Sequence, residues 1–131
     1  MNIVDSSGWL EYFAEGPNAG HFAVPLREPS SLVVPVITIY EVFKVAFREA
    51  GENEALQAVA AMQQGQVIDV TMSLAMHAAR LSHRHNLPMA DSMILATAVS
   101  RECVIWTQDA HFENLPGVHY FPKGAAGQRR G

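Results

Sequence analysis

The sequence contains a single cysteine, Cys103, among its 131 residues. One thiol excludes an internal disulfide, and an unpaired thiol in an apolar segment is typical of a reducing cytoplasm. No apolar run approaches the roughly 20 residues that a membrane-spanning helix needs, so we expect no membrane contact. The first residues also lack the basic flank of a signal peptide. These absences predict a cytoplasmic protein that folds around a hydrophobic core.

Several familiar cofactor and metal motifs are also missing. There is no GxGxxG and no GxxxxGK[ST] motif, so the chain lacks the glycine-rich turns that usually bind the phosphates of dinucleotides and nucleotides. There is no CxxC and no HExxH, so zinc has no recognisable framework. The six histidines are scattered, and we interpret the three on or near one expected helix, His77, His83 and His85, as ordinary surface residues. An active site would therefore have to come from other side chains.

Charged residues are few, at 17%, and they give a net charge of -4. A chain of this kind lacks the basic surface that is typical of nucleic-acid-binding proteins. Nucleic acid is still possible as a substrate, because carboxylates can reach phosphates through a divalent cation. With 49% hydrophobic residues the chain can bury a core, and its length suits one domain. We expect that domain to span residues 1–122, followed by a flexible tail over 123–131.

Short apolar segments alternate with helical periodicities along the chain. Strands are predicted at Asn2–Val4, Leu32–Val34, Gln66–Val70, Cys103–Trp106 and Val118–Phe121. Helices are predicted after Ser6, around Ala19–Leu26, and over Thr38–Ala50, Glu52–Gln64, Thr71–Asn86 and Met89–Arg101. Strands that alternate with helices predict an α/β fold, with a central parallel sheet of about five strands covered by helices on both faces.

Three aspartates occupy positions that are unusual for acids on a solvent-exposed surface. Asp5 ends the first strand and Asp109 follows the fourth, and ligands of open α/β sheets bind at the carboxyl ends of strands. Asp91 lies in the first turn of an otherwise apolar helix, where a carboxylate is costly unless it is paired or binds a cation. The ordinary alternatives are an acid stabilised by the helix dipole for Asp91 and a turn or helix cap for Asp109.

Glu41 is a fourth candidate, although alone it would be a solvated partner of Lys44 or Arg48. Asp5 and Asp109 are expected at the same edge of the sheet, and Asp91 begins a helix that leads away from that edge. Carboxylates that converge there would repel one another unless a hard cation lies among them. Oxygen ligands suit Mg²⁺ or Mn²⁺, and such a site performs phosphoryl chemistry.

Four short motifs give the chain a family resemblance. They are IVDSS from Ile3, IYEV from Ile39, DSMILATA from Asp91 and WTQDAHF from Trp106. Their order and spacing resemble the PIN domain, and most of all the VapC-type toxins of bacterial toxin–antitoxin pairs. The resemblance covers nearly the whole chain. It implies the PIN-like three-layer sandwich, in which the family's acidic positions match Asp5, Glu41, Asp91 and Asp109, and its hydroxyl positions match Ser6 and Thr107.

The resemblance also implies an activity. It implies a divalent-metal-dependent, single-strand-specific endoribonuclease that hydrolyses phosphodiester bonds in tRNA or another structured RNA and inhibits translation until its antitoxin binds. Asp5, Asp91 and Asp109 would hold Mg²⁺ or Mn²⁺, Glu41 would complete the site, and Thr107 would orient a carboxylate or a water. For contacts with the RNA backbone we would look to four basic side chains, Lys44, Arg48, Arg80 and Arg84.

The same resemblance implies partners. In VapC-like proteins the helix that matches Thr38–Ala50 helps to form a homodimer, and a groove beside it receives a VapB-like antitoxin. Val45 falls among charged residues of this helix and Tyr40 lies at its margin, so both are expected to make contacts. A basic side chain of the antitoxin could pair with the acids and displace the metal.

Other functions are compatible with the residues alone. One is a PIN-type nuclease of RNA maturation or repair that has no antitoxin, and another is a catalytically silent α/β binding module in which the acids do not converge. A phosphatase with an aspartate nucleophile fits less well, because such enzymes usually carry a second acid two residues after the first. Ser7 occupies that position here.

Overall fold

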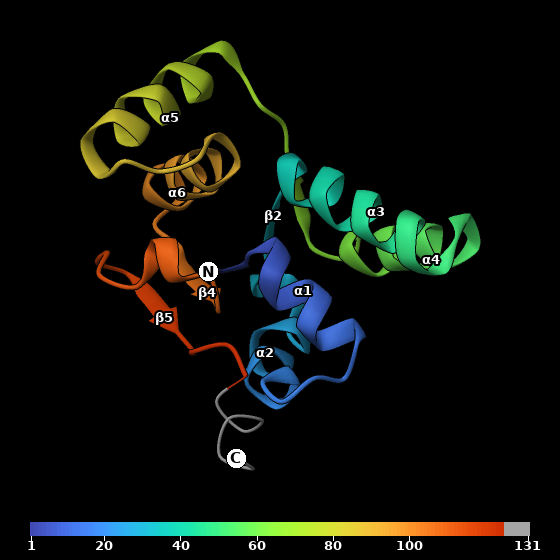
Figure 1. Cartoon of the computed structure of the whole chain (residues 1–131). Coiled ribbons are helices and arrows are strands. Elements are labelled where there is room, and N and C mark those ends of the chain that lie inside the picture. Colours follow the sequence, from blue (N-terminus) through green and yellow to red (C-terminus); the bar gives the residue numbers. More distant parts are fainter. Residues whose placement is uncertain (125–131) are drawn as a thin grey trace.

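The computed structural model describes residues 1–124, so most of the predicted tail, residues 125–131, lies outside the described residues. Parallel strands alternate with helices along this part of the chain (Figure 1). The strands are β1 (Asn2–Val4), β2 (Val33–Pro35), β3 (Gln66–Ile68), β4 (Val104–Thr107) and β5 (Val118–Tyr120). The helices are α1 (Ser6–Phe13), α2 (Ala19–Leu26), α3 (Val36–Ala50), α4 (Glu52–Met62), α5 (Met72–His85) and α6 (Met89–Arg101), with short 3₁₀ turns η1 (Pro29–Ser31) and η2 (Ala110–Phe112).

The strands form the predicted parallel sheet, although its hydrogen bonding is interrupted at one point. β4 pairs with β1 on one side and β5 on the other, and β2 pairs with β3. A single parallel bridge between Asn2 and Leu32 joins the two parts, so the spatial order is β3-β2-β1-β4-β5. The α/β fold expected from the sequence is confirmed.

Helices cover both faces of the sheet, as predicted. Successive strand residues point to opposite faces, so Ile3 and Val4 enter two separate cores. Ile3 packs with side chains of α5 and α6, and Val4 packs with side chains of α1 to α4. In Figure 1, α5 and α6 stack together, away from α3 and α4. No helix within residues 1–124 is long and apolar enough to cross a membrane.

The end of β1 turns directly into α1, and Gly8 makes this possible. A Cβ atom on Gly8 would lie 2.6 Å from Val4 Cγ1 and 2.8 Å from a ring carbon of Phe22. Only a residue without a side chain allows the first turn of α1 to pack this closely on β1. The close packing places Asp5, between strand and helix, at the edge of the sheet where the carboxyl ends of the strands lie.

Helix α3 differs from its prediction in two ways. It begins at Val36 rather than Thr38, because Pro35 ends β2 and is also the N-cap of α3. Its apolar face is not covered along its whole length, since Phe47 is 50% exposed. A 15-residue helix is about 22 Å long, whereas a three-residue strand spans about 10 Å. The sheet is therefore too short to cover all of α3, and the main packing partner of this helix is α4.

Candidate active site

Asp5 is the most buried acid of the site, with 2% of its surface exposed. It is the N-cap of α1, and its Oδ1 accepts the Gly8 N–H at 3.0 Å and the Ser7 hydroxyl at 2.7 Å. Its Oδ2 accepts the hydroxyl of Thr107, at the end of β4, at 2.6 Å. Three donors from two elements therefore hold this carboxylate in one orientation.

Thr107 connects two of the predicted acids. Besides donating to Asp5, its Oγ1 accepts the backbone N–H of Asp109 at 2.9 Å. The next backbone N–H, that of Gln108, donates to Ser7 Oγ at 3.2 Å. Hydrogen bonds thus join the end of β4 to the start of α1, and the Thr107 hydroxyl bonds to the carboxylate of Asp5.

We expect Thr107→Val to lower the free energy of unfolding by about 1–3 kcal/mol, because it leaves a buried carboxylate oxygen and the Asp109 N–H without their partner. Thr107 is fully buried and valine has nearly the same shape, so lost hydrogen bonds should dominate the effect. Urea unfolding measures it. The matched control is Thr97→Val, which removes a buried hydroxyl that bonds only to the Met93 carbonyl within α6. Equal losses in both variants would contradict a special role for Thr107.

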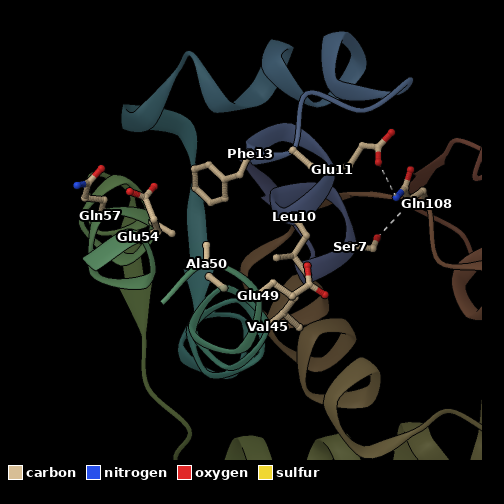
Figure 2. Close-up of a pocket in the computed structure, with 13 residues that line it drawn as sticks. Ser7, Leu10, Glu11, Phe13, Val45, Glu49, Ala50, Glu54, Gln57 and Gln108 are labelled. Carbon is tan, nitrogen blue, oxygen red and sulfur yellow. Dashed lines mark hydrogen bonds between the residues drawn. The ribbon is translucent and has the colours of Figure 1, made fainter. Parts of the chain in front are cut away.

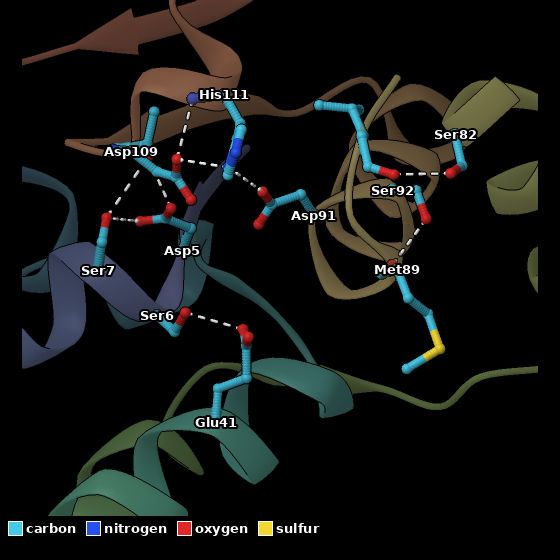
Figure 3. Close-up of polar contacts among 12 residues, drawn as sticks. Asp5, Ser6, Ser7, Glu41, Ser82, Met89, Asp91, Ser92, Asp109 and His111 are labelled. Carbon is cyan, nitrogen blue, oxygen red and sulfur yellow. Dashed lines mark hydrogen bonds and ion pairs between the residues drawn. The ribbon is translucent and has the colours of Figure 1, made fainter. Parts of the chain in front are cut away.

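Asp91 and Asp109 lie on either side of one imidazole. Asp91 is the third residue of α6 and Asp109 caps η2. His111 Nδ1 lies 3.0 Å from Asp91 Oδ2 and 2.9 Å from Asp109 Oδ1 (Figure 3). One ligating atom from each of the three side chains lies within 4.8 Å of the other two, and this is the only group of that kind among residues 1–124.

Glu41 also turns toward the site. It is half-buried on α3, and its Oε1 accepts the Ser6 hydroxyl at 2.8 Å (Figure 3). It forms no ion pair with Lys44 or Arg48 among the residues that the structure describes, and Arg48 instead contacts Glu49 at 3.2 Å. The solvated role that Glu41 would have on sequence grounds alone is therefore not what the structure shows.

Asp5 and Glu41 lie outside the group formed by Asp91, Asp109 and His111, but their charges still act on Asp91. Burial is the main reason why the pKa of Asp5 rises to about 6, against the lowering effect of its three hydrogen bonds, and Asp109 adds to the rise. The pKa of Asp91 rises to about 7, again mainly through burial and then through the charge of Asp109. His111 opposes this rise, whereas Asp5 and Glu41 add to it. Asp91 therefore senses the charge of all three other carboxylates.

This donor set fits a hard divalent cation. Within residues 1–124, no lysine or arginine forms an ion pair with any of the four acids, and His111 is their one basic neighbour. Carboxylates that lie close together without a lysine or arginine partner are the usual surroundings of Mg²⁺ or Mn²⁺. The predicted basic residues are all exposed, Lys44 and Arg48 on α3 and Arg80 and Arg84 on α5.

His111 is a residue of this group that the sequence does not single out. It falls inside the fourth motif, but the motif gives it no role, and it is not among the three histidines interpreted as surface residues. A signal was present, because His111 follows Asp109 by two residues in a segment just after a strand. In a tight turn, the side chains of an aspartate and a histidine two residues apart can point toward the same ligand.

A groove of about 610 Å³ begins beside the acids. Ser7 and Gln108, which belong to the hydrogen-bonded network around Asp5, line one end of it. It continues between α1 and the α3–α4 pair, where Leu10 and Val45 face into it (Figure 2). Val45, predicted as a contact residue, is thus half-buried in the groove. The remaining lining includes Phe13 and Ala50 and three acids, Glu11, Glu49 and Glu54.

Comparisons with known proteins agree with this fold. A search of curated proteins gave no match. Among solved structures, a toxin–antitoxin complex from Klebsiella pneumoniae matches with a TM-score of 0.77 and 22% identity over 93% of this chain and 99% of that chain. VapC20 of Mycobacterium tuberculosis, described as a toxin that cleaves the sarcin-ricin loop, matches with a TM-score of 0.69 and 18% identity over 98% and 95%.

A third solved structure, DNA-bound VapBC from Salmonella typhimurium, matches with a TM-score of 0.67 and 20% identity over 93% of this chain and 98% of that chain. At these identities the structural matches establish the fold. A family model described as PIN domain matches residues 3–118, which is most of the chain and includes all four motifs. This protein therefore belongs to the PIN domain family.

Proposed function

We propose that this protein is a divalent-metal-dependent endoribonuclease that acts as the toxin of a toxin–antitoxin pair. The observation that carries the proposal is the close approach of Asp91 and Asp109 at one edge of the sheet, with the charges of Asp5 and Glu41 acting on Asp91. Within residues 1–124, none of these four acids has a lysine or arginine partner. Membership of the PIN domain family and the fold shared with VapC toxins support it.

In this proposal Asp91 and Asp109 would hold Mg²⁺ or Mn²⁺, and Asp5 and Glu41 would complete the site directly or through water. A cation bound there would stabilise the charge that develops on the scissile phosphate and would lower the pKa of a water. Thr107 keeps Asp5 oriented through its hydroxyl, and Ser6 holds Glu41. The proposed reaction leaves a 5′-phosphate and a 3′-hydroxyl.

Cleavage assays test the activity. Unstructured and structured RNA, tRNA included, should be cut at single-stranded positions in Mg²⁺ or Mn²⁺ and should stay intact in excess chelator. Asp69→Asn is a suitable control, because Asp69 is an exposed acid in a separate hollow that Met1 and Arg101 also line and that none of the four candidates lines. Cleavage that persists in chelator would contradict a metal-dependent mechanism.

The proposed antitoxin would occupy the groove between α1 and the α3–α4 pair. Its apolar walls suit an amphipathic segment, and its acidic residues suit basic side chains of that segment. Because Ser7 and Gln108 lie at the end of the groove, a bound segment could reach the acids. The similar fold of the Klebsiella pneumoniae toxin–antitoxin complex and of the Salmonella typhimurium VapBC supports such a partner.

For the groove, we expect Val45→Asp to weaken binding of the cognate antitoxin by at least tenfold, since the change places a carboxylate against apolar walls that already carry acids. Calorimetric titration of the purified proteins measures this. Leu56→Asp is a matched control on the exposed surface of α4. Unchanged affinity in Val45→Asp would place the antitoxin elsewhere.

The proposed homodimer needs a different test, because Val45 lies in the groove. The large exposed apolar residues of α3 are Tyr40, which is 60% exposed, and Phe47. If α3 forms the dimer, Tyr40→Glu should convert the dimer into a monomer in sedimentation analysis, since a charge would then enter the interface. Val24→Glu, a change at another exposed apolar residue, should leave the mass unchanged. A dimeric Tyr40→Glu variant would exclude this part of α3 as the interface.

A further inference from the structure

We propose that His111 is a ligand of the divalent cation through its Nδ1 atom, so that the site combines oxygen and nitrogen donors and favours a transition metal such as Mn²⁺ over Mg²⁺. This inference rests on the proposed function, because the cation is the one that the nuclease would use. It adds a residue that the four-carboxylate arrangement does not contain.

The spacing of the atoms suits shared coordination. His111 Nδ1 lies 2.9 Å from Asp109 Oδ1 and 3.0 Å from Asp91 Oδ2. An octahedral ion with ligands at about 2.1 Å places neighbouring ligand atoms about 3.0 Å apart. The imidazole nitrogen thus stands at the distance from both carboxylates that adjacent ligands of one ion require. Imidazole suits transition metals, whereas Mg²⁺ prefers oxygen ligands, and this difference predicts the selectivity.

Local structure holds the ring in this position. Asp109 Oδ1 also accepts the backbone N–H of His111 at 2.9 Å, so aspartate and histidine share one short 3₁₀ turn. The adjacent Phe112 is fully buried in the core and anchors this turn. The His111 side chain itself is 55% exposed, so packing does not explain its orientation toward two carboxylates.

The competing explanation is that the imidazole only donates hydrogen bonds and occupies the place of the cation. A neutral imidazole with its proton on Nδ1 has a single N–H there, which cannot serve two carboxylates equally well. The two explanations predict opposite effects of removing the ring. Loss of a ligand weakens metal binding, whereas loss of a competitor strengthens it.

Mn²⁺ binding followed by electron paramagnetic resonance tests the proposal without RNA. Wild-type protein loaded with Mn²⁺ should show the ¹⁴N modulation of a coordinated imidazole, and His111→Gln should lose it. The Mn²⁺ dissociation constant of His111→Gln should rise by about tenfold or more, the size of effect that even outer-shell partners have on metal sites. Mg²⁺ affinity should change less. His83→Gln, an exposed histidine on α5, is the matched control and should behave as wild type.

His111→Ala provides a second variant, and circular dichroism establishes that each variant is folded. Unchanged or tighter Mn²⁺ binding in both variants, or nitrogen modulation that persists in them, would overturn the proposal. Wild-type protein that binds no Mn²⁺ would overturn both this inference and the metal-dependent nuclease. Intact nitrogen modulation without any RNA cleavage would refute the nuclease while supporting His111 as a ligand.

Discussion

Asp91→Asn is expected to lower RNA cleavage by about a thousandfold or more while leaving the protein folded. The reason is that a bound cation contributes several kcal/mol of transition-state stabilisation, and each 1.4 kcal/mol corresponds to about a factor of ten. Asp91 is one of the two carboxylates that lie closest to His111, and it senses the charge of the other three acids. A neutral amide in its place keeps the shape of the side chain but binds a divalent cation much more weakly.

Single-turnover cleavage of an unstructured RNA measures this loss, with Asp69→Asn purified in parallel as the control. Asp91 is a better choice than Asp5 for a clean test. Asp5 caps α1 and accepts three hydrogen bonds, so its replacement also disturbs the fold locally. If Asp91→Asn retained wild-type cleavage, the acid cluster could not be the active site.

The second large effect concerns stability and pH in the metal-free protein. The pKa of Asp91 rises from 3.8 to about 7 on folding, so between these values the native state binds more protons than the unfolded state. Its contribution to stability is therefore fully present below about pH 4 and is lost as the pH rises through 7. Asp5, with its pKa raised to about 6, acts in the same direction over a narrower range.

At about pH 8, metal-free Asp91→Asn should accordingly be more stable than metal-free wild type, by roughly 2–4 kcal/mol. At about pH 4 the two proteins should be equally stable. Urea unfolding across this range measures the difference. Adding Mn²⁺ should stabilise the wild-type protein at about pH 8 and should do so far less in the variant. Parallel pH profiles for the two proteins would show that Asp91 does not carry an unfavourable charge.

Helix α3 shows what periodicity alone leaves open. Val45 interrupts the charged side of the helix, and the sequence therefore predicts that it makes contacts. In the folded protein it lies in the groove beside α1, and the large exposed apolar residues are Tyr40 and Phe47. Periodicity describes one helix by itself, whereas exposure depends on which neighbours the helix meets and where the sheet beneath it ends.

The sequence by itself determined the order of strands and helices and the position of Asp5 and Asp109 just after strands. These features follow from local patterns, and parallel strands bring their carboxyl ends to one edge whatever their order in the sheet. The acidic character of that edge was therefore predictable. The nature of the fold was also predictable, because alternating strands and helices allow few arrangements.

Only the tertiary structure decided how the site is assembled. Ile3 pairs with Ile105, which brings the Thr107 hydroxyl to Asp5 across 102 positions of the chain, and no local pattern encodes that pairing. The same holds for Glu41, which turns to Ser6 rather than to a neighbour on its own helix. It also holds for His111, whose ring lies between two carboxylates. Turn η2 comes after β4 in the chain, and the fold brings it next to Asp91 at the start of α6. Such contacts depend on non-local packing, which sets the direction of each side chain after local propensities have set the elements.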